Sequence, residues 1–396
     1  MNRQNLILSA FLFFAATSTT FAQDSLLTSL ARNNMTTFVK QADTFLGAGW
    51  EKIIKKATAS NDILIGEDHF TNEIPYFTSA IVSKIKFENF FCEIDPFTSE
   101  ILQGKIKNLS PLALRNYVNT YGNAFSFYAF APEFELLKQL SISNTIIRGT
   151  DQILLIGDRI ICNELEQTTR NKEAKYLYKL IADSSKLYFD NFLKDQNKPF
   201  YLLTDDFAKN IDKLSLLKLS TQETKIIEAI KLSAKIYKSQ NHNLRIQLMK
   251  NQLMQTFGSW SGKRNLFKYG ANHLAGGESF LEIYDLGNLV SNINDANFKS
   301  SLHIMILGVS GTQASPFEGF PAENINPNSS MLKCLKPITR VIDGEQWSCF
   351  DLLPLRKELN EGRLKISDIK MQRVIKGYDL LVIIPKVTAS RFVKEK

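Results

Sequence analysis

The stretch at residues 62–69, Asp-Ile-Leu-Ile-Gly-Glu-Asp-His, decides the fold, because a short apolar run ends in a glycine and three polar residues. An apolar run of this length that ends at a glycine is typical of a buried strand. An apolar-periodic segment follows at residues 76–85, directly after Pro75, and it predicts a helix. The stretch therefore predicts a strand, a loop and a helix in succession.

The same alternation recurs along the chain. Further strands are expected at residues 89–94, 145–148, 266–269, 302–307 and 379–384. Strands that alternate with helices form mostly parallel sheets whose faces are covered by the helices. The expected fold class is therefore α/β, with a mostly parallel sheet flanked by helices.

A helical insertion is expected at residues 157–259. This region has few Gly or Pro residues and carries long apolar series at i, i+3 and i+4, such as Ile226, Ile230 and Ile236. A separate helical domain is the alternative that the pattern leaves open. The α/β core is then expected to consist of residues 23–156 and 260–396. Within it, residues 314–344 are rich in Pro, Asn and Gly, and they predict a loop.

The N-terminus predicts export. Residues 1–22 carry Arg3, an apolar run at residues 6–16 and the small-residue pattern Thr-Phe-Ala ending at Ala22. This is the pattern of a secretory signal peptide, with an uncleaved anchor as the alternative. The mature chain is therefore expected to be secreted or periplasmic. Beyond this segment no apolar stretch of about 18 residues follows, so no membrane span is expected in the mature chain.

The charge pattern excludes one class of partner. The chain has 48 Lys and Arg residues against 40 Asp and Glu residues, a net charge of +8. On the helices expected near residues 172–186 and 225–238 the lysines alternate with acidic residues, which is typical of a solvated surface rather than a nucleic-acid stripe. The expected partner is a small-molecule or peptide substrate.

Cys334 and Cys349 are close enough in sequence to form a disulfide after export, and this pairing is left open.

Two of the four histidines follow predicted strands in similar sequences. Gly66-Glu-Asp-His69 follows the first strand, and Gly270-Ala-Asn-His273 follows another. Residues just beyond the carboxyl ends of parallel strands line the ligand crevice of an open sheet. We therefore expect both histidines to face one crevice. The glycine in each segment permits a tight exit from the strand and a close approach of the backbone to a ligand.

Three acidic residues also lie at the ends of apolar strands, namely Glu67, Glu93 and Asp151. Burying an acid is costly unless that edge forms a polar site. Each has an ordinary structural interpretation as well: Glu67 as a helix cap, Glu93 as a surface acid and Asp151 as a turn residue. Arg245, on the last helix of the expected insertion, is a candidate to stabilise an oxyanion or bind a substrate carboxylate.

These groups permit two kinds of chemistry. His69, His273 and Glu93 form a plausible ligand set for a divalent metal such as Zn, Mn or Co. The same groups can work without a metal, with His69 as the general base and a carboxylate that orients it. The sequence leaves both alternatives open.

In combination and order, these motifs resemble the erythromycin esterase/ChaN-like superfamily, whose relatives include the Tiki/TraB proteins. The resemblance rests on residues 63–70 (ILIGEDHF), 149–152 (GTDQ), 245–249 (RIQLM) and 267–274 (FKYGANHL), with Glu93 where relatives place an acid. His69 follows the shorter Gly-Glu-x-His spacing rather than the Gly-Glu-x-x-His of the esterases. Gln252 stands where an Asn is expected.

The resemblance implies a parallel α/β fold with a helical insertion, and a hydrolase of an ester or amide bond. The implied catalytic residues are His69, Glu67, Glu93, His273 and Arg245, and the implied substrate-binding residues are Asp151, Gln152 and Tyr269. One alternative on the same scaffold is a haem- or iron-binding protein in which Tyr269 and a histidine supply the axial ligands. Another is a non-catalytic envelope protein that binds a partner.

Overall fold

The computed structural model describes residues 25–393, so the predicted signal segment at residues 1–22 lies outside the described residues. The described residues form two compact units. Unit 1 comprises residues 25–68, 271–311 and 324–387, and unit 2 comprises residues 69–270, 312–323 and 388–393. The domain boundaries predicted after residues 156 and 259 both lie within unit 2 and stay a prediction.

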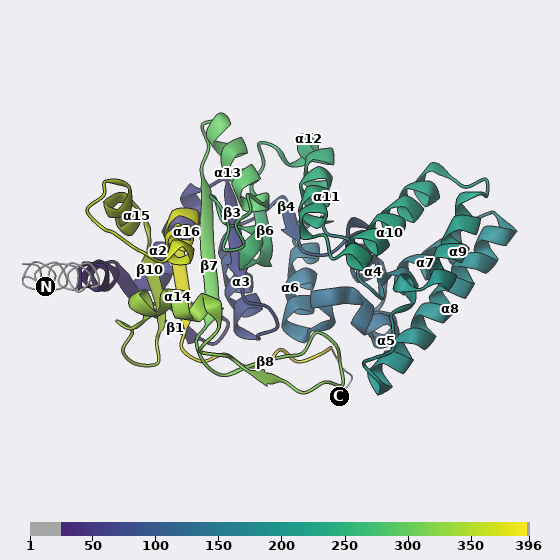
Figure 1. Cartoon of the computed structure of the whole chain (residues 1–396), viewed down its shortest axis with the longest axis horizontal. Helices are drawn as coiled ribbons and strands as arrows, with labels where there is room; N and C mark the ends of the chain where they lie inside the picture. Colours follow the sequence, from purple (N-terminus) through teal and green to yellow (C-terminus); the bar gives the residue numbers. More distant parts are fainter. Residues whose placement is uncertain (1–24, 394–396) are drawn as a thin grey trace, which may run out of the picture. The chain divides into compact units, whose positions relative to one another are not determined.

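Unit 1 is built on six hydrogen-bonded strands (Figure 1). Their order is β2 (Thr44–Leu46), β1 (Met35–Gln41), β10 (Trp347–Asp351), β11 (Leu380–Ile384), β7 (Ser301–Gly308) and β3 (Asp62–Glu67). β3, β7 and β11 are parallel, and β10, β1 and β2 join on in antiparallel pairs. The parallel strands read as almost continuous apolar runs because helices cover both of their faces. The strands predicted near residues 62, 302 and 379 are confirmed.

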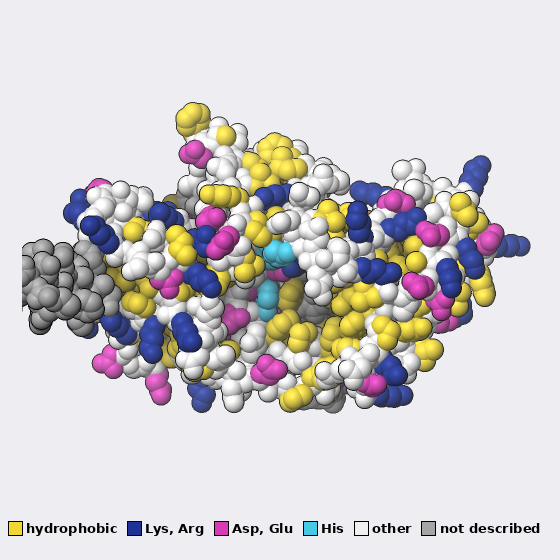
Figure 2. Space-filling view, viewed as in Figure 1, with side chains coloured by type: hydrophobic (Ala, Val, Ile, Leu, Met, Phe, Trp, Pro, Cys, Tyr) yellow, Lys and Arg dark blue, Asp and Glu magenta, His cyan; other side chains and the backbone are white. Residues whose placement is uncertain are grey.

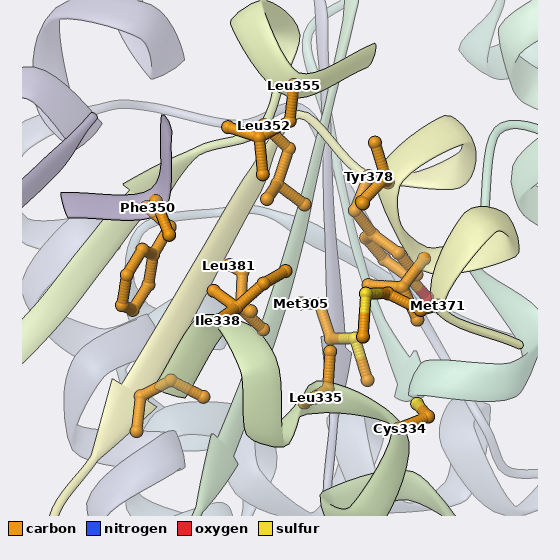
Figure 3. Packing of buried hydrophobic residues seen from close by; sticks show 14 of the residues in the cluster. Met305, Cys334, Leu335, Ile338, Phe350, Leu352, Leu355, Met371, Tyr378 and Leu381 are labelled. Carbon is orange, nitrogen blue, oxygen red and sulfur yellow. The ribbon is translucent and has the colours of Figure 1, made fainter. Parts of the chain in front are cut away.

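Helices complete unit 1. They are a helix over residues 25–33, α2 (Ala48–Ala59), the 3-10 helix η3 (Ala271–His273), α13 (Leu286–Ala296), α14 (Ser330–Thr339), α15 (Leu353–Asn360) and α16 (Ile369–Gly377). In the core of this unit, Met305 and Leu381 from the strands pack against Leu335, Ile338 and Met371 from α14 and α16 (Figure 3). All five side chains are at most 2% exposed.

The loop prediction for residues 314–344 was wrong at α14. The helix begins at the N-cap Ser329, whose hydroxyl accepts a hydrogen bond from Leu332 N–H, and it continues past Pro337. The apolar residues at its buried face, Leu335 and Ile338, outweigh the breaking tendency of Pro and of the Asn-rich sequence before it.

Unit 2 contains three parallel strands in the order β6 (Asn265–Gly270), β4 (Asn89–Cys92) and β5 (Ile146–Gly149). These confirm three further predicted strands. β4 ends two residues earlier than expected, so Glu93 lies just beyond its carboxyl end. The helices that accompany these strands are α3 (Glu73–Lys84), α4 (Pro96–Asn108), α5 (Pro111–Tyr121), the 3-10 helix η1 (Gly122–Ala129) and α6 (Ala131–Ile142).

The rest of unit 2 is mainly helical, as predicted for residues 157–259. The elements are α7 (Gly157–Thr168), α8 (Lys172–Lys194), the 3-10 helix η2 (Tyr201–Leu203), α9 (Asp205–Ser215), α10 (Thr221–Ser239), α11 (His242–Gln255) and α12 (Phe257–Trp260). Figure 1 shows α7, α8 and α9 side by side, and basic and acidic side chains are mixed over this region in Figure 2. α10 begins with a capping box between Ser220 and Glu223, and its apolar series is buried.

Among residues 25–393, no helix is long and apolar enough to cross a membrane. All four cysteines are buried free thiols, so the structure does not contain the disulfide that the sequence left open between Cys334 and Cys349. Burial raises the pKa of both of these thiols to about 12.

Candidate functional site

Unit 2 brings His69 and Glu93 together. The two side chains come from different segments: His69 is the first residue of unit 2 after β3, and Glu93 follows β4. His69 Nε2 lies 3.5 Å from Glu93 Oε2, and the Glu93 side chain is only 5% exposed. The backbone N–H of Gly270, the last residue of β6, donates a 2.7 Å hydrogen bond to the same carboxylate oxygen. The carboxylate is therefore held in place beside the imidazole.

Aromatic packing sets the plane of the His69 ring. The Phe127 ring stacks on it, with centroids 4.4 Å apart and an angle of 25° between the planes. Phe70, the next residue after His69, has a positive φ of 65°, which is costly for an aromatic side chain. The Phe70 carbonyl accepts hydrogen bonds from the N–H groups of Ala314 (3.0 Å) and Ser390 (2.9 Å). These bonds hold the strained turn that follows the histidine.

Arg245 joins two of the predicted acids. Its Nη2 donates to Glu93 Oε1 at 2.7 Å, while Nε and Nη2 donate to the two oxygens of Asp151 at 2.9 and 2.5 Å. Burial works to lower the pKa of Arg245, but the two adjacent carboxylates outweigh it and hold the pKa well above its ordinary value. Such a bidentate pair fixes geometry as well as charge. It ties α11 to the segments that follow β4 and β5.

A cavity of about 210 Å³ lies at this group. Glu93, Asp151, Gln152 and Arg245 supply part of its polar wall, and Phe127 supplies part of its apolar wall. Pockets that enclose a whole drug-sized ligand measure roughly 300–1,000 Å³. This cavity therefore suits a small group or one end of a larger substrate.

Asp95 lines the same cavity and begins α4. Its carboxylate accepts hydrogen bonds from the N–H groups of Phe97 and Thr98, at 3.0 and 2.8 Å, and so caps the helix. The side chain lies at a position only 2% exposed. Burial, the largest effect, raises the pKa of Asp95 from 3.8 to about 6 in spite of the capping hydrogen bonds.

The raised pKa of Asp95 predicts a pH-dependent loss of stability. The folded chain holds this proton more tightly than the unfolded chain, so stability falls as the pH rises from about 4 to about 6 and stays lower above that range. Asp95→Asn keeps the cap and removes the ionisation. We expect its unfolding free energy, relative to the parent, to rise by about 2 kcal/mol between pH 4 and pH 7 in urea titrations.

Asp368→Asn is the matched control, because Asp368 caps α16 through the same two kinds of backbone hydrogen bond but is exposed. This variant reports the effect of the same substitution at an exposed cap. A difference for Asp95→Asn that stays constant over this range would contradict the burial argument.

Tyr269, predicted to contact substrate, is placed in the core. The residue is 1% exposed, and its hydroxyl lies 2.7 Å from the hydroxyl of Thr150. It is not part of the cavity wall, whereas Gln152 is. The haem-binding alternative drew on Tyr269 as an axial ligand and stays a prediction.

His273 and Glu67 belong to unit 1. His273 Nδ1 lies 2.7 Å from Asp285 Oδ2, and these side chains are 6% and 2% exposed. Asp285 also accepts a hydrogen bond from Leu286 N–H at the start of α13. A carboxylate at one ring nitrogen fixes the orientation of an imidazole and leaves the other nitrogen for chemistry. Glu67 is buried at the end of β3.

Sequence reasoning missed Asp285. Its only sequence signal is its position as an N-cap before an apolar-periodic segment, and that signal is common to many structural aspartates. The predicted common crevice for His69 and His273 stays a prediction, because the two residues belong to different units.

The metal interpretation also stays a prediction. Among residues 25–393, no group of three or more His, Cys, Asp or Glu side chains is arranged to hold a metal ion. Within unit 2 the Glu93 oxygens already accept hydrogen bonds from Gly270 and Arg245. Metal ligation by Glu93 would therefore have to displace one of these hydrogen bonds.

No family model and no curated protein matches this sequence. Solved structures do match this chain. A protein described as a succinoglycan biosynthesis protein is 14% identical, with 93% of this chain and 98% of that chain covered and a TM-score of 0.54. A Bacillus cereus protein is 14% identical, with 93% and 99% covered and a TM-score of 0.53. A variant of the erythromycin esterase EreC in its open conformation is 13% identical, with 87% and 95% covered and a TM-score of 0.54. The chain therefore has the α/β fold of the erythromycin esterase, which confirms the fold implied by the sequence resemblance.

Proposed function

We propose that this chain is a hydrolase of ester or amide bonds and that His69 is its general base. The observation that carries the proposal is the pairing of His69 with a buried carboxylate, Glu93, which is itself fixed by Arg245. The fold shared with an esterase supports the reaction class. The cavity of about 210 Å³ that Glu93 and Arg245 line supports a substrate that inserts a small acyl or alcohol portion.

His69 would take a proton from the attacking water. The imidazolium that forms is positively charged, and the Glu93 carboxylate 3.5 Å from Nε2 would stabilise it. This gap is longer than a good hydrogen bond, and catalytic hydrogen bonds of this kind often shorten when substrate binds. Stacking against Phe127 keeps the ring in the plane that the pair requires.

Arg245 would serve two purposes. Its Nε and Nη2 hold Glu93 and Asp151, and among the described residues no partner engages its Nη1. Nη1 is therefore left to donate to a substrate oxygen as negative charge develops there. The Arg245 side chain is 22% exposed and lines the cavity, so a bound substrate can reach it.

The experiment that tests the proposal is a hydrolysis screen of the purified protein with 4-nitrophenyl esters of two to eight acyl carbons and with chromogenic peptide amides. Hydrolysis above that of buffer and of heat-denatured protein supports it. Absence of turnover on every ester and amide would contradict it.

A second measurement decides between the metal-free and metal-dependent alternatives. Hydrolysis is expected to persist after dialysis against a chelator, because His69 and Glu93 need no metal for general base catalysis. Elemental analysis of the parent beside the His69→Ala/His273→Ala double variant is the companion assay. Near-stoichiometric Zn, Mn or Co in the parent alone, together with loss of turnover on chelation, would favour the metal-dependent alternative.

Gly270→Ala is expected to impair the site without unfolding the chain. A Cβ at Gly270 would lie 2.8 Å from His69 Nε2 and 3.5 Å from Glu93 Oε2, so the imidazole must move. A displacement of about 1 Å at a catalytic group can cost about a hundredfold in rate. We therefore expect a fall in kcat of ten- to a hundredfold, measured on the best ester from the screen.

Gly104→Ala is the control, because a Cβ at this position in α4 meets no atom within 4 Å. It should keep full turnover and gain about 0.5–1 kcal/mol of stability from the helix. Unchanged turnover in Gly270→Ala would mean that His69 has no part in the chemistry.

A further inference from the structure

The cavity wall in unit 2 contains a serine in a conformation that normally requires glycine. Ser126, within η1, has φ 55° and ψ −128°. Residues with a Cβ rarely adopt such angles, and they persist only where the surrounding structure enforces them. Both neighbours are anchored, since Phe125 is fully buried and Phe127 stacks on His69. Packing of the two neighbouring residues therefore keeps the Ser126 backbone in this strained conformation.

The strained residue lies where a ligand would bind. Ser126 lines the same cavity as Glu93 and Arg245. It is only partly buried, and its hydroxyl has no hydrogen-bond partner among the described residues. A hydroxyl can donate one hydrogen bond and accept others. In this cavity the Ser126 hydroxyl is therefore available to form a hydrogen bond with a ligand.

A glycine would satisfy the backbone of this turn at lower cost, so the presence of a serine calls for a role of its side chain. Strained residues of this kind cluster at ligand sites. Resting on the proposed hydrolase function, we infer that Ser126 is a substrate-binding residue whose hydroxyl donates a hydrogen bond to an oxygen of the bound ester or amide. It orients the substrate beside His69, and it forms no covalent bond.

Two substitutions at Ser126 distinguish the effect of losing the hydroxyl from the effect of relieving the backbone strain. Ser126→Ala removes the hydroxyl and keeps the strained Cβ, whereas Ser126→Gly removes both. Each should lower kcat/KM for the best 4-nitrophenyl ester by about tenfold, because each loses the same hydrogen bond to substrate. Ser126→Gly alone should raise the thermal unfolding midpoint, because the strain is relieved.

Gln240→Gly is the matched control. Gln240 also has a positive φ, 48°, but it is exposed at the end of α10 and does not line the cavity. This variant should raise the unfolding midpoint and leave kcat/KM unchanged.

The outcomes distinguish this inference from the proposed function. A parent that hydrolyses neither an ester nor an amide overturns both, because the substrate for Ser126 is then missing. A parent that is active, with both Ser126 variants retaining its kcat/KM, overturns the role of Ser126 alone. A tenfold fall of kcat/KM in both Ser126→Ala and Ser126→Gly, together with an unchanged kcat/KM in Gln240→Gly, supports the role of Ser126.

Discussion

His69→Ala is expected to lower kcat for ester hydrolysis by roughly 10²- to 10⁴-fold, the contribution of a positioned general base. The His69 side chain is 23% exposed, and most single substitutions cost about 0.5–3 kcal/mol, so the fold should remain. Steady-state kinetics on the best ester from the screen give the size of the effect. The thermal unfolding midpoint, measured beside it, reports whether the variant is folded.

His242→Ala is the control for this result, because His242 is another partly buried histidine of unit 2, at the start of α11. It should keep the turnover of the parent. If His69→Ala is folded and keeps full turnover too, His69 is not the base.

Arg245→Met is expected to have the largest effect on stability. The substitution leaves the carboxylates of Glu93 and Asp151, with side chains 5% and 9% exposed, without their shared cation. Removing one partner of a buried ion pair costs about 3–5 kcal/mol, because the remaining charge is uncompensated. Urea unfolding at pH 7 measures this loss.

The triple variant Glu93→Gln/Asp151→Asn/Arg245→Met is the control, since it removes all three charges together. It should recover most of the lost stability and should remain inactive. If Arg245→Met alone unfolds within about 1 kcal/mol of the parent at pH 7, the three groups do not form a tightly coupled network.

The parallel strands could be predicted because burial on both faces leaves a plain signal. β3 and β11 are buried along their whole length, and their sequences are apolar almost throughout. The antiparallel strands of unit 1 could not be recognised in the same way. In β1 only Phe38 is buried, and the other positions are polar or partly exposed. Such a strand owes its place to pairing with β10 rather than to its own pattern.

Some residues of the site could likewise be predicted from a local sequence pattern, and others could not. His69, Glu93 and Asp151 could be nominated because they follow apolar strands, where burying a polar or charged group is costly unless that edge of the sheet forms a polar site. The strain at Ser126 could not be foreseen, since it arises from packing of the residues on either side. The contact between Gly270 and His69 joins segments about 200 residues apart, and single-residue patterns carry no information on such distances.

Chemical rescue of His69→Ala by imidazole tests the central proposal most directly. Free imidazole can enter the space left by the side chain and supply the missing base, with Glu93 still in place to stabilise its charge. We predict that ester hydrolysis by this variant rises with imidazole and saturates, while a His69→Ala/Glu93→Gln double variant gains much less. Imidazole also hydrolyses esters without the protein. If the rates of both variants rise with imidazole only as much as this background reaction does, His69 is not the general base.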